Sequence, residues 1–120
     1  MNHEWRATAT RDELFCKELC NTLGITYISS TISALHIDPP KEQSKEAAGR
    51  YYRKHFLESV RQKYNAKKIF VGHHQDDQIE TFFIKLIRGT SIEGLSCIKS
   101  INGYYYRPLL HLAKKTILDY

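Results

Sequence analysis

The sequence predicts an α/β fold in which a parallel sheet carries helices on its faces, and three observations support this class. Helical and strand-like segments alternate along the 120 residues, an order typical of right-handed crossovers between parallel strands. The run Ile-Phe-Val-Gly at 69–72 is continuously apolar, as strands buried on both faces are. Hydrophobic residues make up 42% of the chain, enough for one modest core in a single domain.

The first forty residues predict one helix followed by extended chain. Leucines and cysteines recur at helical spacing within 10–23, and Gly24 stands where a helix commonly ends. The segment 25–28 is rich in isoleucine and tyrosine and predicts a strand. A second apolar run, 32–37, stops before two prolines at 39–40, which forbid further strand pairing.

The middle of the chain predicts a long basic helix. Within 44–64, apolar and aromatic residues recur near the helical period, and lysines and arginines occupy the remaining surface. The block 41–68 holds nine basic and three acidic residues, and the whole chain has a net charge of +5. This balance favours a polyanionic partner, although an acidic protein or an anionic membrane surface would satisfy it equally.

The helix after the 69–72 strand has the clearest pattern in the sequence. It is expected to start near Asp77, after which apolar residues follow at i, i+3, i+4, i+7 and i+8, and Gly89 stands just past its end. Farther on, an Asn-Gly pair at 102–103 between β-rich stretches predicts a hairpin. An Arg-Pro pair at 107–108 then precedes a last helical stretch.

The loop between this strand and this helix is the best candidate for a functional site. It holds His73, His74, Asp76 and Asp77 at the carboxyl end of a strand, where open α/β sheets bind ligands. Asp77 and Glu80 also fit the N-cap and N3 positions of the helix, so capping is the plainer interpretation, and one residue can serve both purposes. Adjacent histidines on an extended loop point to opposite sides, so at most one faces the pocket.

Metal and disulfide chemistry are less well supported by the sequence. A metal hydrolase would need histidines at i, i+2 on a strand or i, i+4 on a helix, and the pair at 73–74 has neither spacing. Cys16, Cys20 and Cys97 are an odd number and lack a disulfide-framework spacing. The first two share a helix face, and we expect small buried side chains there rather than half of a zinc site. With no apolar export signal or membrane-spanning stretch, we expect a cytoplasmic protein.

Several motifs resemble, in order and spacing, those of tRNA(Ile)-lysidine synthetase, a family of N-type PP-loop ATPases. The matching segments are His-His-Gln-Asp-Asp-Gln-Ile-Glu-Thr at 73–81, Arg-Gly-Thr-Ser at 88–91, Gly-Leu at 94–95, Arg-Pro-Leu-Leu at 107–110, Glu-Ala-Ala at 46–48 with Arg50 and Arg53, and Asn-His-Glu-Trp-Arg at 2–6. The resemblance covers nearly the whole chain. It implies a Rossmann-like fold of the PP-loop ATPase and adenine nucleotide alpha hydrolase type.

The resemblance also implies a reaction. That family adenylates the C2 oxygen of the wobble cytidine, C34, of tRNA(Ile) with ATP, and the ε-amine of lysine then displaces AMP to form lysidine. The implied activity is therefore that of an AMP-forming carbon–nitrogen ligase with ATP and Mg²⁺ as cofactors. The implied partners are tRNA(Ile) with a CAU anticodon and free L-lysine, without a membrane, and a homodimer is compatible with the resemblance.

Site residues follow from the same resemblance. Carboxylates one helical turn apart would hold the lysine ammonium, and these are Asp77 and Glu80. The ATP and Mg²⁺ side would be formed by His74, Asp76 and Arg88, with Asp76 the weaker candidate for the metal. Phosphates of tRNA or ATP would be neutralised by Arg50, Arg53 and Arg107, although each of these arginines, taken singly, also fits a solvated helix face.

The sequence departs from the family's pattern in four places. It has no counterpart of the Ser-Gly-Gly-x-Asp-Ser phosphate loop or of the C-terminal tRNA-binding region, so residues 1–120 are expected to be a partial PP-loop domain that is inactive alone. Lys54 replaces a usual tyrosine, and Ser91 replaces a usual glycine whose turn, at positive φ, would strain a serine. Two alternatives remain open, namely a tRNA-thiolating relative, although a Cys-x-x-Cys pair is lacking, and a non-catalytic module that binds RNA through 41–68.

Overall fold

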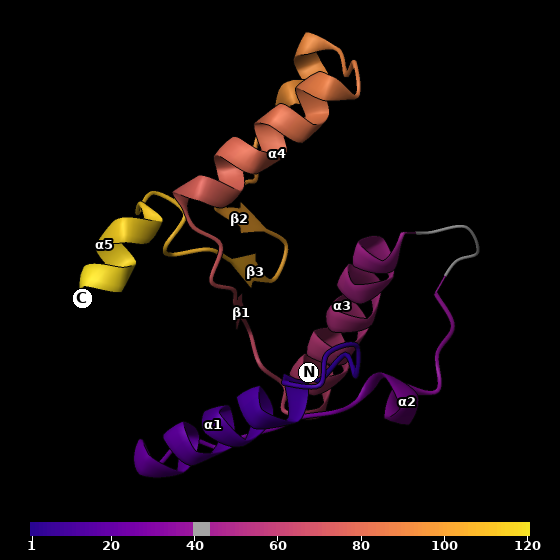
Figure 1. The fold of residues 1–120 in the computed structure, drawn as a ribbon, viewed down its shortest axis with the longest axis vertical. Coiled ribbons are helices and arrows are strands. Elements are labelled where there is room, and N and C mark those ends of the chain that lie inside the picture. Colours follow the sequence, from indigo (N-terminus) through magenta and orange to yellow (C-terminus); the bar gives the residue numbers. More distant parts are fainter. Residues whose placement is uncertain (40–43) are drawn as a thin grey trace. The chain divides into compact units, whose positions relative to one another are not determined.

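The computed structural model describes residues 1–39 and 44–120, which form two compact units, Met1–Tyr64 and Asn65–Tyr120 (Figure 1). Each unit is described by itself. The second proline at 39–40 and the first three residues of the basic block 41–68 lie outside the described residues.

The first unit is built from helices. Their bounds are α1 (Ala9–Thr22), α2 (Ile32–Leu35) and α3 (Lys45–Lys63). The prediction of α1 is confirmed, and Gly24 follows it with φ of 66°, a conformation that glycine adopts without strain. The long helix predicted at 44–64 is confirmed as α3. The Ser44 hydroxyl caps its start by accepting a hydrogen bond from the backbone N–H of Ala47 at 3.2 Å.

The strand predicted at 25–28 is wrong, as is the extended run at 32–37. Residues 25–28 are irregular, and pairing in this region is an isolated parallel bridge between Asn2 and Thr31, with the N–H of Asn2 2.9 Å from the carbonyl of Ser30. The Thr31 hydroxyl accepts from the N–H of Ala34 at 3.2 Å, which starts the short helix α2 instead. A strand needs a series of hydrogen bonds to a neighbouring strand, and in this described segment one residue pair is bridged.

The core of the first unit lies along α3. Tyr52 and Phe56, one helical turn apart, are both buried. The ring of Trp5 packs directly on Gly49, where an added Cβ would lie 3.0 Å from the ring, and the ring of His3 lies beside it with 4.9 Å between centroids. The N-terminal segment therefore lies across α3 at its one glycine.

The expected burial of the cysteines of α1 is wrong. Cys16 is exposed and Cys20 is half-buried. Leu14, Phe15 and Leu19 on the same helix are also exposed, because little of the first unit covers α1.

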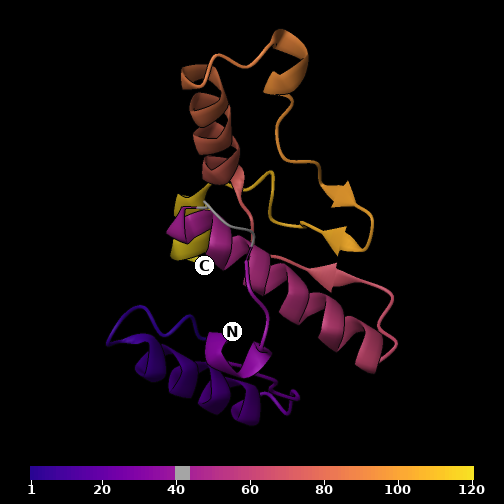
Figure 2. The ribbon, with the colours of Figure 1, turned by 90° about the vertical axis from the view of Figure 1, so that its right-hand side faces the viewer.

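The second unit combines a small sheet with helices. Its elements are β1 (Ile69–Phe70), α4 (Gln75–Ile87), the 3₁₀ helix η1 (Ile92–Leu95), β2 (Ile101–Asn102), β3 (Tyr105–Tyr106) and α5 (Lys114–Asp119). The strand order is β1-β3-β2, with β1 parallel to β3 and β2 antiparallel to it. Figure 2 shows the three arrows side by side with β3 in the middle.

The predicted α/β class is therefore confirmed, but the sheet of the described residues is mixed rather than wholly parallel. The predicted hairpin is confirmed, with Gly103 at φ of 58° in the turn between β2 and β3. Ile69 of β1 is buried, whereas Phe70 is 66% exposed, so only one face of this strand is covered. Leu110 is the most buried apolar side chain among the described residues of the unit.

The helix predicted from Asp77 is confirmed as α4, but its start is different. The N-cap is His74 and the first helical residue is Gln75, which puts Asp77 at N3 rather than at the N-cap. Gly89 follows the helix with φ of 68°, as expected. The apolar stripe that predicted the helix is largely exposed, and Ile87 at its end is 83% exposed.

The turn after α4 is tightly packed. The expected strain at Ser91 is wrong, because its φ is −57°, an ordinary value for any residue. A Cβ built on Gly94 would collide with the methyl group of Thr90. With Thr90 in this rotamer, position 94 has room for glycine and not for a Cβ. None of the helices in the described part of the chain is both long and apolar enough to span a membrane.

Candidate functional site

The loop between β1 and α4 is held at both ends by backbone hydrogen bonds. The N–H of Val71 donates to the carbonyl of Tyr106 at 3.0 Å, which continues the parallel pairing of β1 with β3. The N–H of Gln75 donates to the carbonyl of Leu112 at 2.9 Å. The segment 72–74 thus spans two fixed points, and the side chains of its histidines are half-buried.

Asp77 is positioned by the start of α4. Its Oδ2 accepts a hydrogen bond from the backbone N–H of His74 at 2.7 Å, half of a capping box. The same Oδ2 lies 3.5 Å from Nδ1 of His74, a buried ring nitrogen without a hydrogen-bond partner. A carboxylate accepts more than one hydrogen bond, and the side chain of Asp77 remains 32% exposed. It can therefore cap the helix and face a cation at once.

Asp76 and Glu80 differ in their surroundings. Asp76 is half-buried, and its Oδ1 accepts from the backbone N–H of Lys114 at 3.3 Å, at the first residue of α5. Glu80 is exposed and lies one turn after Asp77 on α4, where residues three apart are neighbours. Asp76 and Asp77 sit in the first turn of α4, where the helix dipole favours negative charge.

Arg107 connects this loop to the β2–β3 hairpin. Its Nε donates to Nδ1 of His73 at 3.2 Å, and its Nη1 donates to the carbonyl of Lys99 at 2.8 Å. From the sequence, Arg107 was predicted as a phosphate ligand. The contact with His73, which joins residues 34 positions apart, was not predicted.

Two further polar side chains of α4 hold the chain that follows it. The side-chain amide of Gln78 donates to the carbonyl of Ile98 at 2.9 Å and accepts from its N–H at 2.6 Å. The ammonium of Lys85 donates to the carbonyls of Gly94 at 2.9 Å and Ser96 at 2.6 Å. The role of Gln78 was not predicted from the sequence, where its one signal is its place as a polar residue within the histidine- and aspartate-rich motif.

The other three predicted site arginines belong to other elements of the chain. Arg88 is exposed at the C-cap of α4, roughly 17 Å along the helix from Asp77 at 1.5 Å per residue. Arg50 and Arg53 belong to α3 in the first unit. Arg50 forms an exposed ion pair with Glu46 at 2.8 Å, a type that contributes little to stability.

Arg53 lies beside the N-terminal Asn-His motif. Its Nη2 is 3.4 Å from Nε2 of His3. Burial, followed by the charge of Arg53, lowers the pKa of His3 below its usual 6.5, so this imidazole is neutral at pH 7. A neutral ring can accept from the guanidinium, which orients Arg53 along the N-terminal segment.

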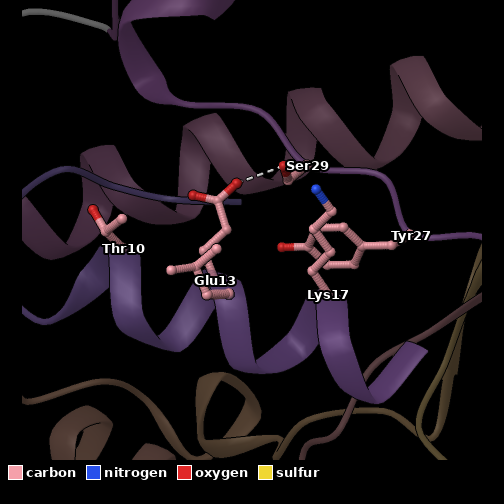
Figure 3. Close-up of a pocket in the computed structure, with 6 residues that line it drawn as sticks. Thr10, Glu13, Lys17, Tyr27 and Ser29 are labelled. Atoms are coloured by element: carbon pink, nitrogen blue, oxygen red, sulfur yellow. Dashed lines mark hydrogen bonds between the residues drawn. The ribbon is translucent and has the colours of Figure 1, made fainter. Parts of the chain in front are cut away.

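The first unit also contains an open pocket of about 340 Å³ beside α1, lined by Thr10, Glu13, Leu14, Lys17, Tyr27 and Ser29 (Figure 3). The Glu13 carboxylate accepts from Ser29 Oγ at 2.6 Å and from Asn2 Nδ2 at 2.9 Å. These two hydrogen bonds lower the pKa of Glu13, whereas burial raises the pKa of Tyr27. Because the carboxylate already joins α1 to the Asn2 bridge, we assign this pocket a structural role.

Among the described residues, no three His, Cys, Asp or Glu side chains gather closely enough to hold a metal ion by themselves. Mg²⁺ commonly binds through one or two carboxylates together with substrate phosphates and water. Asp76 is half-buried beside Asp77 at the start of α4. This arrangement fits a Mg²⁺ ion that is held by one or two carboxylates and by phosphates, rather than one held by protein ligands alone.

Comparisons with known proteins agree with this geometry. The family model described as "PP-loop domain" matches residues 1–120. The chain is 36% identical over 122 residues to the tRNA(Ile)-lysidine synthase of Clostridium acetobutylicum, covering all of this chain and 26% of that protein. It is 38% identical over 112 residues to the tRNA(Ile)-lysidine synthase of Bacteroides thetaiotaomicron, covering 93% of this chain and 26% of that protein.

The chain thus spans about a quarter of the length of the curated relatives that it matches. The resemblance found in the separate motifs extends over the whole sequence, at 34% identity or more to relatives that share one name. The chain therefore belongs to the PP-loop domain family, in the branch similar to the tRNA(Ile)-lysidine synthases.

Proposed function

We propose that this chain is part of an enzyme that uses ATP to ligate L-lysine to C34 of tRNA(Ile), through an adenylated tRNA intermediate. The observation that carries the proposal is the pair of carboxylates, Asp77 and Glu80, on the first turns of a helix that follows a parallel strand. The similarity to tRNA(Ile)-lysidine synthases over the whole chain supports the same substrates.

In this proposal Asp77 and Glu80 bind the ammonium group of lysine. Charge-assisted hydrogen bonds to two carboxylates hold a cation more strongly than neutral acceptors do. The hydrogen bond from His74 to Oδ2 of Asp77 restrains the Asp77 carboxylate, and Glu80 faces solvent, from which free lysine would arrive. The lysine ε-amine, after losing a proton to water, then forms a bond to C2 of the cytidine as the bond from C2 to the AMP oxygen breaks. AMP leaves with the electron pair of that bond, and the nitrogen releases a second proton to water.

His74 and Asp76 face ATP and its Mg²⁺ in this proposal. When bound, Mg²⁺ would neutralise charge on the phosphates, and Asp76 would hold it through one carboxylate oxygen. The N-terminus of α4 offers backbone N–H groups and the positive end of its dipole to an anion. Arg88 remains a candidate for the ATP side on resemblance alone, because it lies at the opposite end of α4.

Phosphate groups of tRNA or ATP would be contacted by Arg50, Arg53 and Arg107. Planar guanidiniums bind phosphate through paired hydrogen bonds, and each contact would release counterions from the nucleic acid. Arg53 is restrained by His3 and Arg107 by His73, so both guanidiniums lose less freedom on binding than an unrestrained side chain does.

The proposal can be tested with a chimaeric enzyme. The matching segment of the Clostridium acetobutylicum tRNA(Ile)-lysidine synthase is replaced by this chain, and incorporation of radioactive lysine is measured with ATP and tRNA(Ile) carrying a CAU anticodon. We expect ATP-dependent incorporation. A chimaera that folds by circular dichroism and binds this tRNA, but incorporates no lysine, would contradict the proposal, and incorporation of sulfur would support the thiolating alternative.

The same chimaera tests the lysine site. Asp77→Asn and Glu80→Gln are each expected to raise the KM for lysine at least tenfold, because each removes one charge from the ammonium. Asp12→Asn, on an exposed residue of α1, is the matched control. If the KM for lysine in all three variants equals that of the unaltered chimaera, the two carboxylates stabilise the start of α4 and do not bind lysine.

A further inference from the structure

We propose that Arg107 is a positioning residue that holds His73 in one tautomer and fastens the loop before α4 to the β2–β3 hairpin. The inference rests on the proposed function only in taking that loop as part of the site. The contact itself is between Nε of Arg107 and Nδ1 of His73, at 3.2 Å. Nothing in the sequence motifs assigns this role to Arg107.

The direction of this hydrogen bond determines where the histidine proton lies. A guanidinium has five N–H donors and no acceptor, so Nδ1 of His73 has to accept. An imidazole whose Nδ1 accepts is neutral and carries its proton on Nε2. Protonating the ring would place an N–H opposite another N–H and bring two positive charges together. The contact therefore selects the neutral Nε2–H form of His73.

Arg107 is itself held on two sides. Its Nη1 donates to the carbonyl of Lys99 at 2.8 Å, and its backbone N–H donates to the carbonyl of Ser100 at 2.9 Å. The fork geometry of the guanidinium lets Nε and Nη1 reach two different acceptors at once. A lysine at this position would have a single ammonium on a flexible stem and could not keep both acceptors in the same arrangement.

The segment that receives Arg107 is in turn held by α4. The amide of Gln78 makes two hydrogen bonds with the peptide groups of Ile98, the residue before Lys99. The connection therefore runs from α4 through Gln78 to the 98–100 segment, and from there through Arg107 back to His73 at the start of the loop. This closed path restrains the 72–74 loop, and with it the first turn of α4 that carries Asp76 and Asp77.

The selected tautomer has a chemical consequence for the site. With its proton on Nε2, His73 presents a donor at that nitrogen, so whichever group faces Nε2 has to accept. Phosphate and carboxylate oxygens are such acceptors. By the same argument, His73 cannot act as a general base through Nε2 while Arg107 occupies Nδ1.

Histidine NMR tests the proposal on this chain without any substrate. The protein is labelled with ¹⁵N-histidine, and its six imidazoles are recorded in long-range ¹H–¹⁵N spectra at about pH 8, above the ordinary histidine pKa of about 6.5. His73 is assigned by its absence in His73→Asn. We expect His73 of the unaltered chain to show a single Nε2–H tautomer. The Nδ1–H form in the unaltered chain would overturn the proposal.

Variants of Arg107 provide the second test. Arg107→Met is expected to convert the His73 signals to a tautomer mixture, and Arg107→Lys is expected to restore the Nε2–H form only partly. Lys115→Met, at an exposed residue of α5, is the matched loss of one positive charge and should leave His73 unchanged. If Arg107→Met also leaves the His73 signals unchanged, Arg107 does not position the ring, whatever the chimaeric enzyme shows about lysine ligation.

Discussion

Replacement of Gln78 by methionine tests how strongly α4 holds the segment before β2. The substitution keeps an unbranched side chain of similar length and a similar helix propensity, so α4 itself should be little affected. It removes both hydrogen bonds between the Gln78 amide and the peptide groups of Ile98, at 2.9 and 2.6 Å. The effect should therefore be confined to the contact between α4 and residues 98–100.

The expected magnitude follows from these two hydrogen bonds. Both are part-buried, and a neutral hydrogen bond contributes about 0.5–1.5 kcal/mol net to stability, so the loss is about 1–3 kcal/mol. The backbone N–H and carbonyl of Ile98 are left without these partners, which favours the upper part of this range if water does not replace them. At 1.4 kcal/mol per factor of ten, local opening at Ile98 should become about 5- to 140-fold more frequent.

Amide hydrogen exchange measures this opening directly. The exchange rate of the Ile98 amide is compared in the unaltered chain, in Gln78→Met and in Gln75→Met, the same substitution on an exposed residue of the first turn of α4. We expect a large increase in Gln78→Met and almost none in the control. Equal rates in the two variants would show that the Gln78 amide does not hold Ile98, and the closed path inferred for Arg107 would then lose its link to α4.

Three further substitutions have effects that follow from single contacts. Gly49→Ala gains about 0.5–1 kcal/mol of helix stability, but the new methyl group would lie 3.0 Å from the ring of Trp5, the single tryptophan, and would displace it. We therefore expect the tryptophan fluorescence to shift to longer wavelength, and an unshifted spectrum would contradict this packing. Hydrogen bonds from Ser29 and Asn2 lower the pKa of Glu13 from 4.5, so this carboxylate stabilises the fold above that pH and its contribution is lost as the pH falls through the lowered pKa. Glu13→Gln should therefore flatten the acid-unfolding curve below about pH 4.5, and an unchanged curve would show that these hydrogen bonds are not formed in solution. Lys85→Met should speed amide exchange within 92–96 severalfold, because the Lys85 ammonium holds two carbonyls there. Exchange rates at 92–96 that are the same in the variant and in the unaltered chain would contradict this.

The longer helices α1, α3 and α4 were predictable because their signals are local. In α1 and α3 the spacing of apolar residues lies within the helix, Gly24 follows shortly after α1, and the Ser44 cap directly precedes α3. The strand predicted at 25–28 had the right residue types, but strand formation depends on a partner elsewhere in the chain. Among the described residues, the pairing near this segment is a single bridge between Asn2 and Thr31, three residues past the predicted strand.

The candidate site was predictable in position but not in its connections. The motif at 73–81 placed the carboxylates at the start of α4, yet the N-cap is three residues earlier than expected, because Asp77 at N3 accepts from the backbone of His74. The contacts of Gln78 and Arg107 join residues 20 and 34 positions apart. No periodicity or local spacing carries such information.

The collision at Gly94 restricts which mutations the turn after α4 can accept. Every amino acid other than glycine carries a Cβ, and any Cβ here meets the methyl group of Thr90. Each missense change of this codon, even to alanine or serine, would therefore require the Thr90 side chain to rotate or the turn to shift, whereas Gly72 has open space around the same position and an unexceptional backbone. In a saturation library selected for a folded product, substitutions should therefore be rarer at codon 94 than at codon 72.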